Sequence, residues 1–286
     1  MMHSDFSDKA CVEFLQRCLV KLRYRWAGYR KIRSQVCKRI KRRITELHLS
    51  GFDEYHEYLE NNTREWEVLD SLCYVTISRF YRDRAVFETL QNEILPHLAE
   101  ESLKQKKNEL HVWSAGCCSG EEPYTVNILW KLSRKGWLTP CVKPKLETEI
   151  ECSILATERS DSLLKRARHA VYSKSSLKDL PDELKSQAFE KQNDHYKLKQ
   201  RFIEGVTFIN QDIRDQTPDG NFDLVLCRNL VFTYFQEDLQ KAILEKIVEC
   251  LEPGGFLVTG IHESLPDGCT ALKPYKKNSS IFQKFL

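Results

Sequence analysis

The first seventy residues carry their hydrophobic side chains at helical spacing. Two runs of apolar positions recur at short helical intervals: Phe14, Leu15, Leu19 and Leu22, and then Ile32, Val36, Ile40, Ile44 and Leu47. Ser50 and Gly51 are typical of a helix end, and a further helix is expected from Phe52. Because nothing here alternates with a period of two, we predict a small all-α domain over residues 1–69.

The pattern changes in residues 70–286, where short apolar runs alternate with amphipathic segments. We expect strands at residues 110–115, 153–157, 207–210, 222–227 and 256–260, and helices at 85–99, 121–132, 160–170 and 236–251. Such alternation is typical of an α/β fold, with a mostly parallel sheet and helices on both of its faces. A ligand then binds at the carboxyl ends of the strands.

Two stretches fall outside this repeat. Residues 188–206 contain an Asn193-Asp194 turn beside alternating residues, which predicts a small hairpin insert. Residues 276–285 predict a second hairpin that closes the sheet.

Composition narrows the class of protein. The 286 residues are 41% hydrophobic, contain no apolar run of membrane-spanning length and begin without the basic-then-apolar layout of a secretory signal. The eleven cysteines include no Cys-x-x-Cys pair, so we expect no metal site. We expect most of them to be buried free thiols, and the protein to be cytoplasmic, without membrane insertion.

Residues 110–125 are the most informative for function. Their pattern predicts a strand that turns through Gly116 and Gly120 into a helix beginning with Glu121 and Glu122. Glycines let the backbone approach a ligand closely, and free N–H groups at a helix start favour anions or polar acceptors. Two carboxylates at the start of this helix would repel a negatively charged pyrophosphate. We therefore expect a nucleoside cofactor with a cationic sulfonium group, and not NAD.

Acidic residues at the ends of two later strands are candidate anchors for the nucleoside. Glu158 could accept hydrogen bonds from ribose hydroxyls, or it could cap the helix that begins near Ser160. Asp212 could contact the adenine amine, or it could serve in a turn.

Arg228 and Asn229 follow a strand of apolar character. A charge directly after a core strand needs a partner, which a binding cleft or a structural carboxylate supplies. Tyr234 follows closely and either walls the reaction centre or packs in the core.

A polar segment upstream joins the two predicted domains. Its hydroxyls at Thr76 and Ser78, with Arg82 nearby, could reach a cofactor, and Arg82 could bind a carboxylate with two parallel hydrogen bonds. The alternative is a solvated linker.

Several ordered blocks together resemble the CheR family, the glutamate methyltransferases of chemotaxis receptors. The resemblance runs from about residue 20 to the end, and rests on Ser78-Arg-Phe-Tyr-Arg-Asp, Ala115-Gly-Cys-Cys-Ser-Gly-Glu-Glu-Pro-Tyr, Ile154-Leu-Ala-Thr-Glu, Cys227-Arg-Asn and Leu251-Glu-Pro-Gly-Gly-Phe-Leu. It implies a Rossmann-like class I methyltransferase sheet preceded by a small all-α domain. It also implies S-adenosylmethionine as cofactor and the formation of methyl esters on protein glutamates.

The resemblance assigns roles to individual residues. It implies a cofactor-binding set of Thr76, Ser78, Arg82, Gly116, Glu122, Glu158, Asp212, Ile213, Arg228 and Asn229. Four of these depart from the family's residue types: Thr76 replaces Asn, Glu158 replaces Asp, and Asp212 and Ile213 replace Asn-Leu. At the reaction centre we expect Arg228 to orient the acceptor carboxylate and Tyr234 to shape its channel. One residue more than usual stands between Asn229 and Tyr234, which leaves the role of Tyr234 open.

The N-terminal region is strongly basic. From Lys21 to Arg43 it contains eleven Lys or Arg residues and no Asp or Glu. In the CheR family a basic helix is thought to face acidic receptor helices, and residues Lys31 to Arg43 correspond to it. The competing explanations are nucleic-acid binding, which we do not expect, and a plain solvated face.

A glutamate acceptor simplifies the expected chemistry. With a reference pKa of about 4.3 the side chain is ionised and nucleophilic at neutral pH, so no general base is needed. The alternatives are methylation of a small acid or of another protein site, and an inactive regulator that only binds the cofactor. The sequence does not identify the acceptor, its pathway or the oligomeric state.

Overall fold

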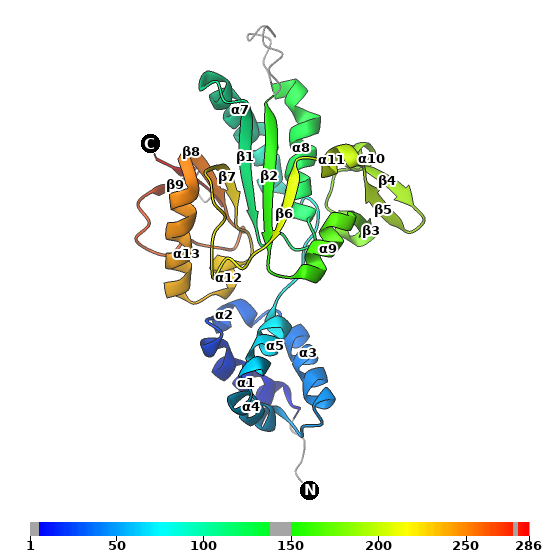
Figure 1. The fold of residues 1–286 in the computed structure, drawn as a ribbon, viewed down its shortest axis with the longest axis vertical. Coiled ribbons are helices and arrows are strands. Elements are labelled where there is room, and N and C mark those ends of the chain that lie inside the picture. Colours follow the sequence, from blue (N-terminus) through cyan, green and yellow to red (C-terminus); the bar gives the residue numbers. More distant parts are fainter. Residues whose placement is uncertain (1–5, 138–149, 277–279, 286) are drawn as a thin grey trace. The chain divides into compact units, whose positions relative to one another are not determined.

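The computed structural model describes residues 6–137, 150–276 and 280–285. The chain forms two compact units (Figure 1). The first comprises the residues up to Thr76 together with Leu230–Gln240, and the second comprises Ile77–Asn229 and the residues from Lys241 onward. The sequence interpretation placed residues 230–240 in the second domain, whereas in the structure they belong to the first compact unit.

The first unit is helical. Its helices are α1 (Asp8–Lys21), α2 (Trp26–Tyr29), α3 (Arg33–Glu46), α4 (Phe52–Asn61), α5 (Thr63–Cys73) and the short α12 (Val231–Tyr234). The apolar positions at helical spacing form its core: α1 buries Phe14 and Leu15, and α3 buries Ile40 and Ile44. The predicted all-α region is therefore confirmed.

Helix α12, which is distant from α2 in the sequence, packs against α2 within this unit. Arg25 donates from its backbone N–H to the carbonyl of Tyr234 (2.8 Å) and from its Nε to that of Thr233 (3.0 Å). Gly28 lies so close to Thr233 that a Cβ atom would stand 2.3 Å from the Thr233 carbonyl oxygen. Only glycine permits this approach of α2 to α12.

One cysteine pair is an exception to the free thiols expected for most of the cysteines. Cys11 on α1 and Cys37 on α3 form a disulfide, with their Cα atoms 6.1 Å apart. The two residues face each other because α1 and α3 pack together, which residue spacing along the chain does not reveal. The other cysteines of the described residues are free, and all of them except Cys269 are buried, as expected.

The second unit is built on a seven-stranded sheet of order β6-β2-β1-β7-β8-β10-β9. Five strands are parallel: β1 (Glu109–Ala115), β2 (Glu151–Glu158), β6 (Val206–Asn210), β7 (Phe222–Leu226) and β8 (Leu251–Val258). The last two, β9 (Leu272–Pro274) and β10 (Ile281–Lys284), form an antiparallel pair with β10 against β8. The predicted α/β class is confirmed.

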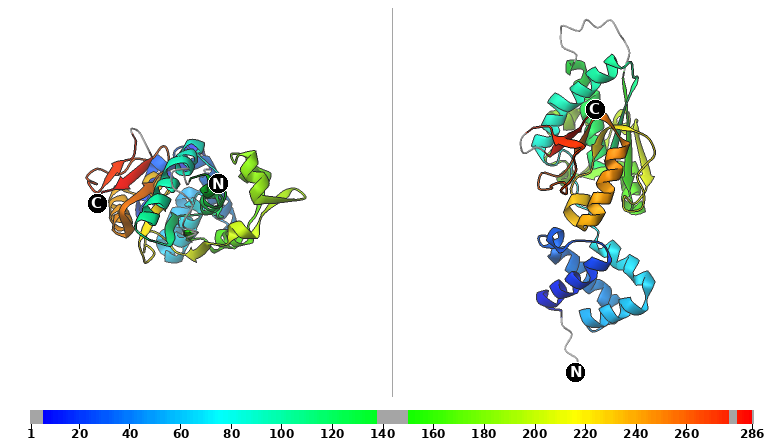
Figure 2. Two further views of the ribbon diagram at one scale, coloured as in Figure 1. Left: turned by 90° about the horizontal axis from the view of Figure 1, so that it is seen from above. Right: turned by 90° about the vertical axis from the view of Figure 1, so that its left-hand side faces the viewer.

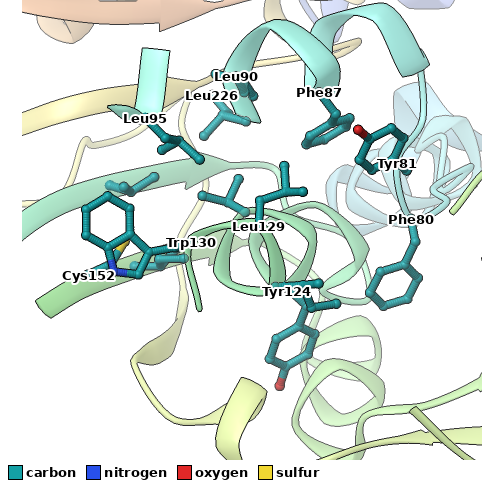
Figure 3. Packing of buried hydrophobic residues seen from close by; sticks show 14 of the residues in the cluster. Phe80, Tyr81, Phe87, Leu90, Leu95, Tyr124, Leu129, Trp130, Cys152 and Leu226 are labelled. Atoms are coloured by element: carbon teal, nitrogen blue, oxygen red, sulfur yellow. The ribbon is translucent and has the colours of Figure 1, made fainter. Parts of the chain in front are cut away.

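Helices cover this sheet. They are α6 (Arg84–Thr89), a π-helical turn (Leu90–Ile94), α7 (Leu95–Lys104), α8 (Glu121–Trp137), α9 (Asp161–His169) and α13 (Glu237–Cys250). The sequence predicted one helix at 85–99, where the structure has α6, the π-helical turn and α7 in direct succession. Figure 3 shows how Phe80, Tyr81 and Phe87 pack with Tyr124 and Leu129 of α8 in the main core. This packing anchors residues 80–87 beside the start of α8.

A small second sheet contains the hairpin predicted at residues 188–206 as β4 and β5, and adds an earlier strand, β3. Its order is β3-β5-β4, with β3 (Val171–Ser173), β4 (Phe189–Gln192) and β5 (His195–Leu198) all antiparallel. The short helices are a 3₁₀ turn (Lys174–Leu177), α10 (Asp182–Ala188) and α11 (Gln200–Ile203). The left view in Figure 2 shows this small sheet to one side of the large one. Strand β3 was not foreseen because three residues are too short to show a pattern.

Within the described ranges, no helix has both the length and the apolar character needed to cross a bilayer.

Candidate functional site

A left-handed bend joins β1 to α8. Gly116, Cys118 and Gly120 have φ angles of 70°, 51° and 89°. The N–H groups of Gly116 and Cys117 donate to the Thr157 carbonyl at 2.8 and 3.0 Å, which ties the bend to the end of β2. The bend therefore brings the carboxyl ends of these two neighbouring strands together, where a ligand binds in folds of this type.

Glu158 closes the adjacent side of the bend. Its side chain accepts from the Cys118 N–H (3.1 Å, Oε2) and from the Ser160 N–H (2.9 Å, Oε1), and the residue is only 1% exposed. The hydroxyl that caps α9 belongs to Ser160, which accepts from the Leu163 N–H at 3.4 Å. Each oxygen of a carboxylate can accept two hydrogen bonds, which suits Glu158 to hydroxyl donors.

The two carboxylates at the start of α8 have different surroundings. Glu121 is 2% exposed; its Oε1 accepts from the Ser119 hydroxyl (2.9 Å), and its Oε2 is buried with no partner among the described residues. Burial raises the pKa of Glu121, although hydrogen bonds from Ser119 and Ser78 act in the opposite direction. Glu122 accepts from the Ser114 hydroxyl (2.8 Å) and from Arg228 Nη1 (3.1 Å).

Arg228 is enclosed by acceptors. Its Nη2 donates to Asp83 Oδ2 (2.8 Å) and to the Arg82 carbonyl (2.9 Å), and its guanidinium lies 5.0 Å from the centre of the Phe87 ring. The side chain is 3% exposed. Arg228 therefore has the structural carboxylate partners that the sequence left as an alternative. Two carboxylates around one guanidinium leave this cluster with a surplus of negative charge.

Asp83 was missed by the sequence interpretation. It has a left-handed φ of 63°, as Tyr81 does at 60°, and Arg82 stands between them. A non-glycine residue in this conformation is uncommon and costs about 1–2 kcal/mol. The available signal was the acidic residue inside the basic block Arg82-Asp83-Arg84, which does not reveal its partner.

A second carboxylate, from Glu263, holds the backbone of the turn after β7. Asn229 has a φ of 54°, and its N–H donates to Glu263 Oε2 at 2.8 Å. Glu263 was also absent from the candidates, because a single acidic residue in a loop carries no recognisable pattern.

The predicted adenine contacts lie after β6. Both oxygens of Asp212 accept from the Arg214 guanidinium at 2.6 to 3.1 Å, and Arg159 Nη1 lies 3.6 Å from Oδ2. Hydrogen bonds and charge from Arg214 hold the pKa of Asp212 below its ordinary value, against the opposing effect of burial. Ile213 is buried.

The remaining predicted residues divide between the two units. Ser78 and Arg82 lie in the second unit, where Arg82 donates to the Ile77 carbonyl at 2.8 Å. Thr76 ends the first stretch of the first unit and is exposed. Tyr234 also belongs to the first unit, where its ring packs 5.3 Å from that of Tyr29.

The donors and acceptors of this site fit a cationic nucleoside. Glu121, Glu122 and Glu158 surround the bend, and one buried oxygen of Glu121 has no partner among the described residues. Carboxylates favour sulfonium, ammonium and hydroxyl groups, and they repel phosphate. S-adenosylmethionine has the first three groups and lacks the fourth.

Comparison with known proteins identifies the family. The family described as "CheR methyltransferase, SAM binding domain" matches residues 76–281, and "CheR methyltransferase, all-alpha domain" matches residues 31–70. The chain belongs to the CheR methyltransferase family. The predictions of this family, of S-adenosylmethionine as cofactor and of a protein-glutamate O-methyltransferase are confirmed. Methylation of a small acid and an inactive regulator are not favoured.

Relatives of this CheR-family chain are described as chemotaxis protein methyltransferases. The chemotaxis protein methyltransferase of Borreliella burgdorferi is 30% identical over 220 residues, which are 75% of this chain and 74% of that protein. The chemotaxis protein methyltransferase of Vibrio parahaemolyticus is 32% identical over 210 residues, 72% of this chain and 70% of that protein. That of Listeria monocytogenes is 28% identical over 232 residues, 81% of this chain and 82% of that protein.

Proposed function

We propose that this chain forms methyl esters on glutamate side chains of a chemoreceptor, in the cytoplasm. The observation that carries the proposal is the convergence of Glu121, Glu122 and Glu158 on the bend between Gly116 and Gly120. Relatives described as chemotaxis protein methyltransferases support the receptor substrate.

We assign the cofactor's parts to residues by their chemistry. Glu158 accepts from the ribose hydroxyls, Glu122 meets the α-amino group, and Ser78 and Arg82, with Thr76, hold the carboxylate. Asp212 and Ile213 flank the adenine, and Gly116, Arg228 and Asn229 provide backbone walls. When bound, S-adenosylmethionine supplies a methyl group on a positively charged sulfur.

The protein's own contribution is alignment. An acceptor glutamate is already ionised at neutral pH, so the site has to hold its carboxylate in line with the methyl group and keep water out. Both Nη atoms of Arg228 are engaged by Glu122, Asp83 and the Arg82 carbonyl. We therefore assign Arg228 to the positioning of Glu122. The predicted role of orienting the acceptor would require the guanidinium to exchange one of these contacts, and Tyr234 remains our candidate for shaping the acceptor channel.

A labelling experiment tests the proposed function. The protein is incubated with S-adenosylmethionine carrying a radioactive methyl group and with the cytoplasmic fragment of a chemoreceptor. Base-labile label on the fragment, lost when its acceptor glutamates are changed to alanine, is the expected result. Stable label, label on small molecules only, or failure to bind S-adenosylhomocysteine in calorimetry contradicts the proposal.

We further propose that α3 docks an acidic substrate. The contacts that its Lys and Arg side chains already make within the protein show which of them can meet a partner. Arg43 donates to both oxygens of the buried Glu65 at 2.8 Å, and Arg39 donates to the Tyr74 carbonyl at 2.6 Å. Lys38 and Arg42 are exposed and stand four residues apart on one face of the helix, and among the described residues Arg42 donates only from Nε, to the partly exposed Glu46 at 3.0 Å. Within the predicted segment from Lys31 to Arg43, these two are the residues on α3 best placed to meet a partner.

A further inference from the structure

A single carboxylate oxygen joins the ends of two neighbouring strands. Glu263 Oε2 accepts from the N–H of Asn229 at 2.8 Å and from the N–H of Gly260 at 2.6 Å. Asn229 follows β7 and Gly260 follows β8, and these strands pair in parallel up to Leu226 and Val258. The Glu263 N–H donates to the Gly260 carbonyl at 2.9 Å, which closes a tight turn around the same point.

The backbone at this junction has little freedom. Asn229 adopts a left-handed φ of 54°. A Cβ atom on Gly260 would stand 2.8 Å from Glu263 Oε2 and 2.9 Å from Asn229 Oδ1. Both side chains therefore pack directly against the glycine, and any other residue there would push them away.

Arg228 and Asn229 are thus fixed from two directions. Glu122 and Asp83 hold the Arg228 guanidinium, and Glu263 holds the Asn229 backbone. Hydrogen bonds to a charged acceptor are stronger than neutral ones, so the carboxylate reinforces a left-handed conformation that asparagine tolerates better than most residues do. Without the carboxylate, two N–H groups lose their acceptor, and Asn229 can relax toward ordinary backbone angles.

We infer that Glu263 is a positioning residue for methyl transfer. It does not contact the cofactor; it holds the Arg228–Asn229 turn in the shape that walls the cofactor site. The inference rests on the proposed function, in which this turn contacts S-adenosylmethionine.

The test compares Glu263→Ala and Glu263→Gln with a matched control. The Asp223 side chain also accepts a backbone hydrogen bond, from His111 at 2.9 Å, and it pairs with Lys107 at 3.3 Å, but it lies near the opposite end of β7. Asp223→Ala therefore removes a comparable interaction away from the turn. For each variant we would measure S-adenosylhomocysteine affinity by calorimetry, the KM for S-adenosylmethionine, kcat and the unfolding midpoint.

Glu263→Ala is expected to weaken S-adenosylhomocysteine binding by about tenfold or more and to raise KM by a similar factor. Glu263→Gln keeps one oxygen acceptor and should recover affinity to within about threefold of wild type. Asp223→Ala should lower the unfolding midpoint and leave affinity unchanged.

The outcomes separate this inference from the proposed function. Wild-type protein that binds no S-adenosylhomocysteine overturns the proposed function itself. Wild-type affinity in Glu263→Ala, or an equal loss in Asp223→Ala, overturns the positioning role alone. If Glu263→Ala does not fold, Gly260→Ala provides the test, because the added Cβ displaces the Glu263 carboxylate. Gly260→Ala should weaken S-adenosylhomocysteine binding by about tenfold, and normal affinity in this variant would refute the inference.

Discussion

Arg228 and Glu122 form a buried ion pair, with 3.1 Å between Nη1 and Oε2, that connects the end of β7 to the first turn of α8. Asp83 engages the second Nη atom of the same guanidinium at 2.8 Å. One cation thus joins three segments around the proposed cofactor site. Removing one partner of a buried pair is costly because the other charges remain without compensation.

We expect Arg228→Ala to lower the free energy of unfolding by about 3–5 kcal/mol and to weaken S-adenosylmethionine binding. Arg228→Lys keeps the charge but replaces the two separate Nη atoms of the guanidinium with one ammonium nitrogen, so it should recover only part of both losses. Urea unfolding and calorimetry measure the two effects. Full turnover of Arg228→Ala with normal cofactor affinity would show that this residue neither positions Glu122 nor orients the acceptor.

Charge reversal on the exposed face of α3 tests substrate docking. The double variant Lys38→Glu/Arg42→Glu should raise the KM for a receptor fragment by about tenfold at low salt, with kcat little changed, because complementary charge acts mainly on encounter. Lys9→Glu, on an 87% exposed side chain of α1, is the control and should behave as wild type. A KM that is unchanged in the double variant would leave α3 as a plain solvated face.

The buried carboxyl of Glu121 makes stability depend on pH. Burial raises its pKa in the folded state, so the folded protein holds this proton more tightly than the unfolded chain does. The resulting stabilisation is complete below the unfolded pKa of about 4.3, and it is lost as pH rises through the raised folded value. Glu121→Gln has no such proton. Its free energy of unfolding relative to wild type should therefore increase as pH rises from 4.5 to 8 in urea titrations; a difference that stays constant would contradict this account.

The Cys11–Cys37 disulfide predicts a redox-dependent stability. The bond closes a loop between residues 26 positions apart, and its loss should cost about 2–4 kcal/mol. Reductant should lower the urea midpoint of the wild type and leave that of Cys37→Ser unchanged. Cys18→Ser changes a free buried cysteine on α1, the helix that carries Cys11, and should retain the response to reductant. A wild-type midpoint that ignores reductant would show that the pair is not bonded in solution.

The sequence predicted what depends on local pattern. The spacing of Ile40 and Ile44 predicted α3, and the strand before Gly116 predicted the bend that begins the site. The sequence did not reveal which distant residues come into contact when the chain folds. The charge of Arg228 indicated a need for carboxylates, but Asp83 lies 145 positions away and nothing in the residue order connects them. Cys11 and Cys37 escaped notice for the same reason, since helix packing and not spacing brings their sulfur atoms together.

The approach of α2 to α12 has a consequence for biosynthesis. Arg25 and Gly28 are translated early, whereas Thr233 and Tyr234, whose carbonyls they meet, emerge from the ribosome about two hundred residues later. At a synthesis rate of roughly 5–20 residues per second, α12 is translated about ten seconds or more after α2. N-terminal segments usually finish folding first during synthesis; here the first unit reaches its native form only after most of the second has been made.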